Sequence, residues 1–501
     1  MNRTYGFLIS ENAKSIQTAS FEVPSNCARI CIRHNIPKNQ ALLVTMVVLD
    51  NRDRVRLQKQ LGYSEPILGI GKKKSETSIG GIPGTIEPGM WTIKLYIATE
   101  HLMKYVDGQQ ISFEVNITDD SKLKIKEHVG KYVWVNKKFI YTQYSTKKVY
   151  QTDTRWYKGD FHTHTRLSDG KETPERAMEK ARGMNLDFYV ATEHNVLHTG
   201  WPETDVMVVP GVEITTSMGH ANLFGLRKRP KFMDDILKYH SHKKMLPKLW
   251  KRIGNWCCKK DVLLSVNHPF LYIWKWEYDE LPLCQISCLE IVNDPTYESV
   301  QVAYAKEANE LAIQLSDVLW EDGYRICAIG GSDSHNEIDE FYEGATEPSI
   351  PGDPATWVYL KKLKPKLLKD ALVEGCSCVT RYVDDLKVNL YVDMKKIYPG
   401  GKIHTNSKNI RWEIMLKCME HKPSLFVLIN GVRKELNLST MDGQHYEGEG
   451  YIELPEEDYC WIRFGAEGEK KEFMLYVNPV TRGMKQHSLV TFGDAKERLR
   501  K

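Results

Sequence analysis

The chain has 501 residues, of which 42% are hydrophobic and 27% are charged, and its formal net charge is +4. These proportions are typical of folded soluble domains and exclude an extensively disordered chain. The absence of an apolar run of ~18 residues excludes a helical membrane protein, and the length predicts several domains because one hydrophobic core rarely serves so long a chain.

The N-terminal segment lacks the charged-then-apolar pattern of a secretory signal, so we expect a cytoplasmic protein that does not engage a membrane. The 11 cysteines form no C-x-x-C pair. Their odd number and scattered spacing argue against a disulfide framework. We interpret them as small apolar packing residues in a reducing compartment.

Residues 1–150 are predicted to form an N-terminal β domain. Short segments of β-forming residues alternate with clusters of Gly, Pro and Asp, a spacing typical of a β-sandwich. The expected strands include 28–32, 41–48, 91–97 and 111–115.

In residues 151–383, apolar strands alternate with helical patterns. Seven candidate strands end at His162, Thr192, Val209, Gly225, Val266, Val292 and Gly330. Thr173 and Pro174 favour the start of a helix that ends at Gly183, and a long helix is expected from Pro295 to Gly323. This alternation predicts parallel strands joined by right-handed crossovers.

A basic stretch between Arg227 and Lys260 contains 12 Lys and Arg residues against 2 Asp. Such a stretch could attract phosphate or nucleic acid, and could place lysines at a site mouth. Apolar residues interrupt it at helical spacing, which favours one long helix with solvated lysines and a kink at Pro247. Nucleic-acid binding is therefore possible but not favoured.

Residues 384–501 repeat the β pattern and are predicted to form a C-terminal β domain. The Asn430-Gly431 pair is a strong signal for a hairpin turn. The polar tail from Lys485 to Lys501 is expected to fray. The expected strands are 386–392, 410–416, 425–429 and 460–464.

Ordered motifs with metal-binding residue types stand at the ends of the candidate strands. They are His162-x-His164 with Ser168-Asp169-Gly170, Thr192-Glu193-His194-Asn195, Gly211-Val212-Glu213, Gly219-His220, Asn267-His268-Pro269 and Gly331-Ser332-Asp333-Ser334-His335. Residues i and i+2 of a strand point to one side, so each H-x-H or D-x-H pair can face one point. Imidazole and carboxylate groups that converge suit Zn, Mn or Fe. Without a cation their burial would be costly.

The segment from about Trp156 to Thr380, which carries these six motifs in order, resembles the PHP family of metal-dependent hydrolases (polymerase and histidinol phosphatase). It is most similar to the CehA/McbA-like branch. The resemblance implies an α/β fold with a distorted seven-stranded β/α barrel, here residues 151–383, flanked by sandwich-like β domains at 1–150 and 384–501. In such barrels the chemistry lies at the C-terminal ends of the strands.

The resemblance also implies how two or three divalent ions (Mn, Zn or Fe) are held. One ion would be bound by His162, His164, Glu213 and Asp333. Glu213 would bridge to a second ion that is also bound by His220 and His268. A third position would consist of Asp169, His194 and His335, and many members of the family have His where Asp169 stands.

Further residues have expected roles in catalysis or substrate binding. His194 or His335 could protonate the leaving group, and Arg166 could pair with a phosphate oxygen. Three polar residues at strand ends are expected to hydrogen-bond ligands or substrate, namely Asn195, His198 and Asn267. Glu290 and Asn293 could either support the ligands or be purely structural.

These features predict a metal-dependent hydrolase that uses a hydroxide shared by the ions and acts on a small-molecule ester, with a phosphate ester favoured. The alternative substrate is an aryl carbamate or carboxylic ester, which would need an apolar wall such as Trp201, Tyr272, Trp274 and Trp276 could provide. A third interpretation is a non-catalytic carbohydrate- or protein-binding protein on the same scaffold, against which the complete ligand set argues. A serine nucleophile in 330–334 lacks the spacing of a nucleophile elbow. The sequence leaves the exact substrate, the metal and the oligomeric state open.

Overall fold

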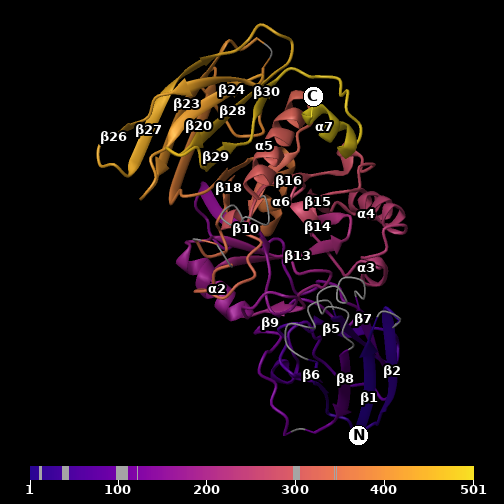
Figure 1. Ribbon diagram of the computed structural model, residues 1–501. Coiled ribbons are helices and arrows are strands. Elements are labelled where there is room, and N and C mark those ends of the chain that lie inside the picture. Colours follow the sequence, from indigo (N-terminus) through magenta and orange to yellow (C-terminus); the bar gives the residue numbers. More distant parts are fainter. Residues whose placement is uncertain are drawn as a thin grey trace.

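The structure of the protein is a computed structural model that describes residues 1–500 except 11–13, 37–43, 98–110, 121, 297–304, 343–344, 346 and 405. An N-terminal pair of sheets lies at one end and a C-terminal pair at the other, with a curled sheet and its helices between them (Figure 1). None of the described helices combines the length and apolarity needed to cross a membrane.

The N-terminal region is a sandwich of two four-stranded antiparallel sheets, as predicted. One sheet has the order β1 (Asn2–Ile9), β8 (Ile111–Thr118), β3 (Arg29–His34) and β6 (Ile67–Gly71). The other has the order β2 (Ile16–Val23), β7 (Gly89–Ile97), β4 (Val44–Leu49) and β5 (Val55–Gln60). Side chains that alternate along the strands, such as Phe21 and Trp91, meet in one apolar core. Positions 41–43 of the expected strand 41–48 lie outside the described residues.

A curled sheet forms the centre of the molecule. Its strands are, in chain order, β10 (Arg155–Thr163), β11 (Phe188–Ala191), β13 (Met207–Thr216), β14 (Gly219–Phe224), β15 (Leu263–Val266), β16 (Cys288–Asn293) and β17 (Cys327–Gly331). Each strand contributes to one apolar cluster, through Phe161, Val190, Val209, Phe224, Leu263, Cys288 and Ile329. The sheet therefore curls around this cluster.

The two ends of the curled sheet meet just beyond β10 and β17. There Asp333 N donates to His162 O at 2.9 Å, and His164 N donates to Ser334 O at 3.3 Å. The structure thus shows a mixed α/β fold with a curled sheet, whereas a closed seven-stranded barrel stays a prediction.

The expectation that all central strands are parallel is wrong for β14. This strand pairs antiparallel with both β13 and β15, while β10–β11, β11–β13, β15–β16 and β16–β17 are parallel. β13 ends at Thr216 and β14 begins at Gly219, which leaves no room for a crossover helix. Gly219 has φ +106°, a conformation that side-chain-bearing residues rarely adopt, so it permits the tight reversal.

Two predicted helices of the central region are confirmed. α2 (Pro174–Gly183) begins at the Thr173 cap, whose side chain accepts a hydrogen bond from Arg176 N at 3.4 Å. α5 (Ala305–Glu321) accounts for most of the expected 295–323 helix, and residues 297–304 lie outside the described chain. A further helix, α6 (Pro365–Glu374), follows the central strands.

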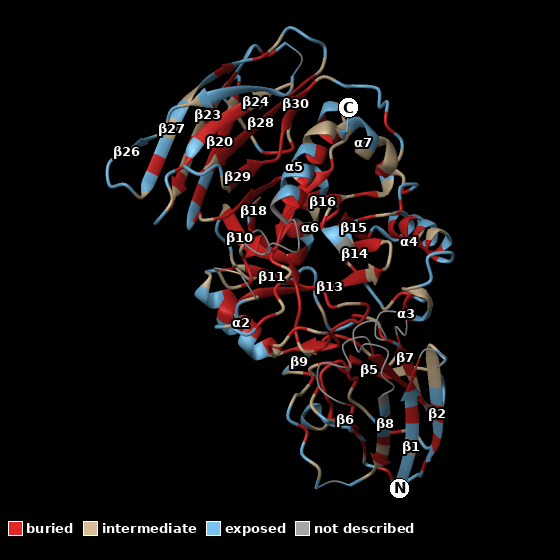
Figure 2. Ribbon diagram, viewed as in Figure 1, coloured by how far each residue is buried: buried red, intermediate tan, exposed pale blue. Residues whose placement is uncertain are grey.

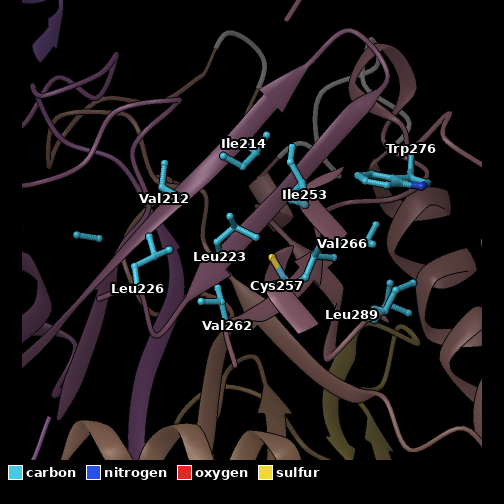
Figure 3. Packing of buried hydrophobic residues seen from close by; sticks show 14 of the residues in the cluster. Val212, Ile214, Leu223, Leu226, Ile253, Cys257, Val262, Val266, Trp276 and Leu289 are labelled. Atoms are coloured by element: carbon cyan, nitrogen blue, oxygen red, sulfur yellow. The ribbon is translucent and has the colours of Figure 1, made fainter. Parts of the chain in front are cut away.

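The basic stretch forms two helices, α3 (Met233–Tyr239) and α4 (Leu246–Lys260), instead of the expected single helix. Pro247 lies in the first turn of α4, where its missing N–H costs no helical hydrogen bond, so it starts a helix and does not kink one. The apolar face of α4 packs on the curled sheet, with Ile253 and Cys257 near Val212 and Leu223 (Figure 3). The outward face of α4 is exposed (Figure 2).

The C-terminal region continues the central sheet. Beyond β10 the order is β18 (Ala355–Leu360), β19 (Ser377–Thr380), β29 (Phe473–Val477), β28 (Cys460–Glu467), β24 (Ser424–Ile429) and β25 (Val432–Leu436). A separate sheet has the order β21 (Lys395–Ile397), β20 (Asp385–Val392), β23 (Asn409–Lys417), β27 (His445–Glu453) and β26 (Ser439–Thr440). One apolar cluster includes residues of both sheets. The boundary at 383/384 stays a prediction, because the β19–β29 pairing crosses it.

Two local expectations for this region have different outcomes. Asn430 and Gly431 have φ values of 47° and 82° and join the antiparallel pair β24–β25, so the predicted hairpin is confirmed. The prediction of a fraying tail is wrong for α7 (Phe492–Leu499). Thr491 and Asp494 form a capping box there, and Phe492 is buried in the central core. Shorter elements are β9 (Tyr132–Val133), β12 (Gly200–Trp201), β22 (Lys402–Ile403) and β30 (Val480–Arg482).

Candidate metal centre

Nine side chains with metal-binding groups gather at one end of the curled sheet. β10 and the residues after it carry His162, His164 and Asp169, β11 precedes His194, β13 and β14 carry Glu213 and His220, β15 precedes His268, and β17 precedes Asp333 and His335. Four overlapping groups of these residues and Glu290 have ligand-type atoms within 4.8 Å of one another. All nine residues proposed from the sequence therefore lie in one place.

The first group surrounds one oxygen of Asp333. His162 Nε2 lies 3.1 Å and His164 Nε2 lies 2.9 Å from Asp333 Oδ1. Glu213 closes the group, with Oε1 at 3.3 Å from His162 Nε2 and Oε2 at 3.6 Å from His164 Nε2. Two imidazoles and two carboxylates thus face one point, which fits a divalent cation.

Glu213 also contacts the other histidines. Its Oε1 lies 3.1 Å from His220 Nδ1 and 3.6 Å from His268 Nε2. Its Oε2 lies 2.6 Å from His194 Nδ1. The carboxylate is completely buried. A single buried glutamate therefore contacts histidines from every part of the centre.

The third group is more open to solvent. Asp169 Oδ2 lies 3.5 Å from His194 Nε2, and Asp169 Oδ1 lies 3.4 Å from His335 Nε2. The two imidazole Nε2 atoms are 3.4 Å apart. These three side chains are 15–23% exposed, whereas those of His162, His164 and Glu213 are 0% exposed. The centre is therefore more open to solvent on the side of Asp169 and His335.

The donor atoms of the centre include buried groups that find no hydrogen-bond partner among the described residues. They are His162 Nε2, His164 Nδ1 and Nε2, Asp169 Oδ1, His268 Nδ1 and Asp333 Oδ1. Buried polar atoms are normally satisfied, and such a group of unpaired nitrogens and oxygens is costly. Coordination to a cation would satisfy most of them, so the residues fit a metal site.

Glu290 contacts two histidines of the centre, one through its ring and one through its backbone. Its Oε1 lies 2.9 Å from His162 Nδ1, and its Oε2 accepts from His268 N at 2.9 Å. A histidine held this way through Nδ1 presents Nε2 to a metal. Asn293 Nδ2 donates to Glu290 Oε2 at 3.1 Å and to Asp333 Oδ2 at 3.4 Å. The sequence signal for Glu290 was a lone carboxylate within an apolar strand, which cannot by itself distinguish support from packing.

The three residues expected to bind substrate are placed differently. Asn267 Nδ2 donates to Glu213 Oε1 at 3.0 Å, and Asn195 Nδ2 donates to Thr215 O at 2.9 Å. His198 Nε2 lies 2.6 Å from Glu193 Oε1 in the interior. All three are buried and contact residues of the centre or residues around it. Their contact with substrate stays a prediction.

The loop that carries Asp169 is held from two sides. Sequence reasoning assigned no role to Glu193, which is completely buried and accepts hydrogen bonds from Thr165 Oγ1 and Ser168 Oγ, both at 2.5 Å. On the other side, Lys59 of β5 donates to Arg166 O. Gln60 N donates to Leu167 O at 3.1 Å. The N-terminal sandwich therefore contacts the loop directly.

Arg166, expected to contact phosphate, is engaged elsewhere. Its Nη1 pairs with Glu127 Oε1 at 2.9 Å, and its Nε donates to Lys171 O at 2.6 Å. No described contact joins it to the nine residues of the centre. A catalytic role for Arg166 therefore stays a prediction.

Several residues of the centre have unusual backbone conformations. Asn195, His268 and Asp333 have φ values of 55°, 27° and 51°. Residues with side chains rarely adopt positive φ, because this backbone conformation costs on the order of 1–3 kcal/mol per residue. Such strained residues occur mainly at functional sites. The strain is consistent with side chains placed for binding.

The charges of the centre shift one another's pKa values. Burial would raise the pKa of Glu213, but the neighbouring histidines, first of them His162, hold it well below its usual range. Burial lowers the pKa of His335, and the Asp169 carboxylate reverses this and raises it to about 10. Burial dominates at His164 and His220 and lowers the pKa of each to about 4.

These shifts predict that metal loading releases protons. The raised pKa of His335 means that its ring carries a proton near pH 7 in the metal-free protein, and a metal binds only the deprotonated ring. Affinity for Zn²⁺ or Mn²⁺ should therefore rise with pH. Addition of the ion to metal-free protein in weak buffer, followed with a pH indicator, should show acidification, and uptake without proton release would contradict the expectation.

Gly331→Ala should disturb the centre. A Cβ at this position would overlap the Cβ of His162 and approach Glu290 Oε1, so the ends of β10 and β17 would have to separate. We expect less bound metal and a loss of about 1–3 kcal/mol in the free energy of unfolding. Gly183→Ala is the matched control, because nothing lies within 4 Å of its added Cβ. Elemental analysis and denaturant titration measure both effects, and equal metal content in the two variants would contradict the close packing.

The expected aromatic wall is only partly available. Trp201 and Trp276 are each 1% exposed and belong to the central core. Tyr272 is exposed and Trp274 is half-buried. The lysines of α4, among them Lys248, Lys251 and Lys259, line a groove that residues of α3 also line and that none of the nine residues of the centre lines. The basic stretch therefore gives no support to electrostatic steering into the centre.

Comparison with known proteins gives weak similarities. No family model matches the chain, and no curated protein sequence is significantly similar. The solved structures that resemble it include a two-domain protein containing a predicted PHP-like metal-dependent phosphoesterase from Bacteroides vulgatus, at 15% identity and TM-score 0.35, covering 67% of this chain and 99% of that chain. Another is a proposed metal-dependent phosphoesterase from Bifidobacterium adolescentis, at 14% identity and TM-score 0.26, covering 39% of this chain and 92% of that chain. Similarity at this level establishes no activity for this chain.

Proposed function

We propose that this chain is a metal-dependent hydrolase of the PHP type, related through its motifs to the CehA/McbA-like branch. One observation carries the proposal: nine histidine and carboxylate side chains converge, and several of their donor atoms are buried without a protein partner. A non-catalytic scaffold would have no reason to keep so costly an arrangement complete.

The contacts support a division of the nine residues among two or three ions. His162, His164, Glu213 and Asp333 would hold the first, and Glu213, His220 and His268 the second. Asp169, His194 and His335 would hold a third at the accessible edge. Metal ions there would lower the pKa of a coordinated water and offset charge on the ester being cleaved. With only two ions bound, the third position would be vacant, and a protonated His194 or His335 at that edge would donate a proton to the leaving group.

A phosphate ester is the favoured substrate, because a cluster of cations suits an anionic group. One observation favours the alternative, an aryl carbamate or carboxylic ester. Two cations of the Asp169 loop itself are already paired, Arg166 with Glu127 and Lys171 with Glu340. Tyr272 is 54% exposed and would offer an apolar surface to an aryl group.

A hydrolysis screen separates these substrates. Protein loaded with Mn²⁺, Zn²⁺ or Fe²⁺ would be tested on p-nitrophenyl phosphate, bis(p-nitrophenyl) phosphate, p-nitrophenyl acetate and 1-naphthyl methylcarbamate. We expect chelator-sensitive turnover of a phosphate ester. Turnover of the neutral esters alone would favour the carbamate or carboxylic ester activity, and no turnover by metal-loaded protein would count against a hydrolase.

A further inference from the structure

A cavity of about 490 Å³ lies between α5 and the C-terminal strands β24, β28 and β29. α5 runs beside these strands (Figure 1). The described residues that line the cavity include none of the nine residues of the metal centre. Its volume falls within the range of about 300–1,000 Å³ that is usual for small-molecule sites.

The cavity combines apolar walls with one buried guanidinium, and other charged side chains, among them Arg433, Glu467 and Lys471, also line it. Ile313, Phe426 and Phe473 contribute to the walls. Arg463 is 4% exposed, and its Nε and Nη2 each donate to Asp317 at 2.7 Å. The ion pair neutralises the charge, yet a guanidinium carries more N–H donors than these two bonds use. The remaining donors are suited to an acceptor oxygen brought by a ligand.

We infer that this cavity is a second ligand site, for a compact aromatic molecule that presents an acceptor oxygen to Arg463. The aromatic body would pack against Phe473, since aromatic rings favour one another beyond their buried area, whereas the Arg433 guanidinium already lies 3.8 Å from the centre of the Phe426 ring. The acceptor would complete the hydrogen bonding of a guanidinium that is otherwise enclosed by protein.

This site is connected to the metal centre through α5. Asn309, which lines the cavity, accepts from Asn293 N through Oδ1 and donates to Asn293 O through Nδ2, both at 3.0 Å. Asn293 in turn donates to Asp333 Oδ2 at 3.4 Å. A ligand that shifts α5 therefore changes the support of Asp333. The coupling rests on the proposed metal centre, whereas the cavity site does not.

The probe for the cavity is 8-anilinonaphthalene-1-sulfonate, an aromatic molecule with acceptor oxygens. We expect saturable, one-to-one binding with enhanced fluorescence. Ile313→Trp fills the cavity from a half-buried wall and should weaken binding by roughly tenfold or more. Leu311→Trp is the matched control on the same helix, because Leu311 is 37% exposed and does not line the cavity. Equal binding by both variants would overturn the site.

Two further measurements test the acceptor and the coupling. Replacement of the whole ion pair, Asp317→Leu with Arg463→Met, avoids an unpaired buried charge. It should still lower the affinity of the protein for the probe. The affinity of the probe should differ between metal-free and Zn²⁺-loaded protein, because linkage is reciprocal, and Asn309→Ala should remove that difference. Unchanged affinity in the double variant would overturn the role of Arg463, and identical affinities with and without Zn²⁺ would overturn the coupling.

Discussion

Glu213→Gln should remove both bound metal and hydrolytic activity. The two oxygens of Glu213 lie within 3.6 Å of five histidines, so one substitution removes a negative charge from every part of the centre. Residues that only hydrogen-bond to metal ligands typically contribute 10–100-fold to metal affinity. We therefore expect Glu213→Gln to lower the metal affinity by on the order of 100-fold or more. Elemental analysis after gel filtration should fall from two or more equivalents per chain to below one, together with turnover.

Two other glutamates calibrate this result. Glu290→Gln keeps the shape but weakens the hold on His162 Nδ1, so an intermediate loss of roughly 10–100-fold in metal affinity is expected. Glu277→Gln alters a surface pair with Lys243 and should change nothing. Circular dichroism should show the β-rich fold retained, since the N-terminal sandwich has a core separate from the metal centre. A Glu213→Gln protein with full metal and activity would remove the bridging assignment.

The sequence predicted which side chains come together for a geometric reason. Ligand-type residues follow strands with a two-residue period, and the ends of neighbouring strands meet at one edge of a sheet. The structure brings His162, Glu213 and Asp333 together, although they are far apart in the sequence. The strand expected to end at Val209 continues to Thr216, because its pairing changes from β11 to β14 at Pro210-Gly211. From the sequence alone, Pro210 and Gly211 resemble the end of a strand, because the pairing of β13 with β14 beyond them is not visible there.

What the sequence did not predict depends on partners distant in the chain. The direction of β14 follows from a two-residue turn, and a parallel alternative could not be rejected from the apolar pattern alone. α7 combines its capping box with the burial of Phe492 in a core that is assembled from the central region. The contact of Lys59 with the Asp169 loop joins residues 107 positions apart and has no local signal.

Lys59→Met should selectively weaken the accessible part of the metal centre. The Lys59 side chain is completely buried, donates to Arg166 O and lies 3.5 Å from Glu127 Oε2, while Glu127 Oε1 holds Arg166. Methionine keeps the volume but leaves the Arg166 carbonyl unpaired. A buried acceptor without a partner costs about 1–3 kcal/mol, and the loop before Asp169 can satisfy it only by moving.

We therefore expect Lys59→Met to lose the ion at the position of Asp169, His194 and His335 while His162, His164 and Glu213 retain theirs. Metal content should fall by about one equivalent if three ions are bound, and turnover by roughly 10–100-fold, the usual cost of losing support outside a ligand set. Lys126→Met is the control, since Lys126 is 74% exposed and pairs with Glu65 at the surface. If Lys59→Met matches Lys126→Met in metal content and turnover, the N-terminal sandwich has no part in holding the Asp169 loop. If it loses every ion, the effect is general destabilisation, which denaturant titration would show directly.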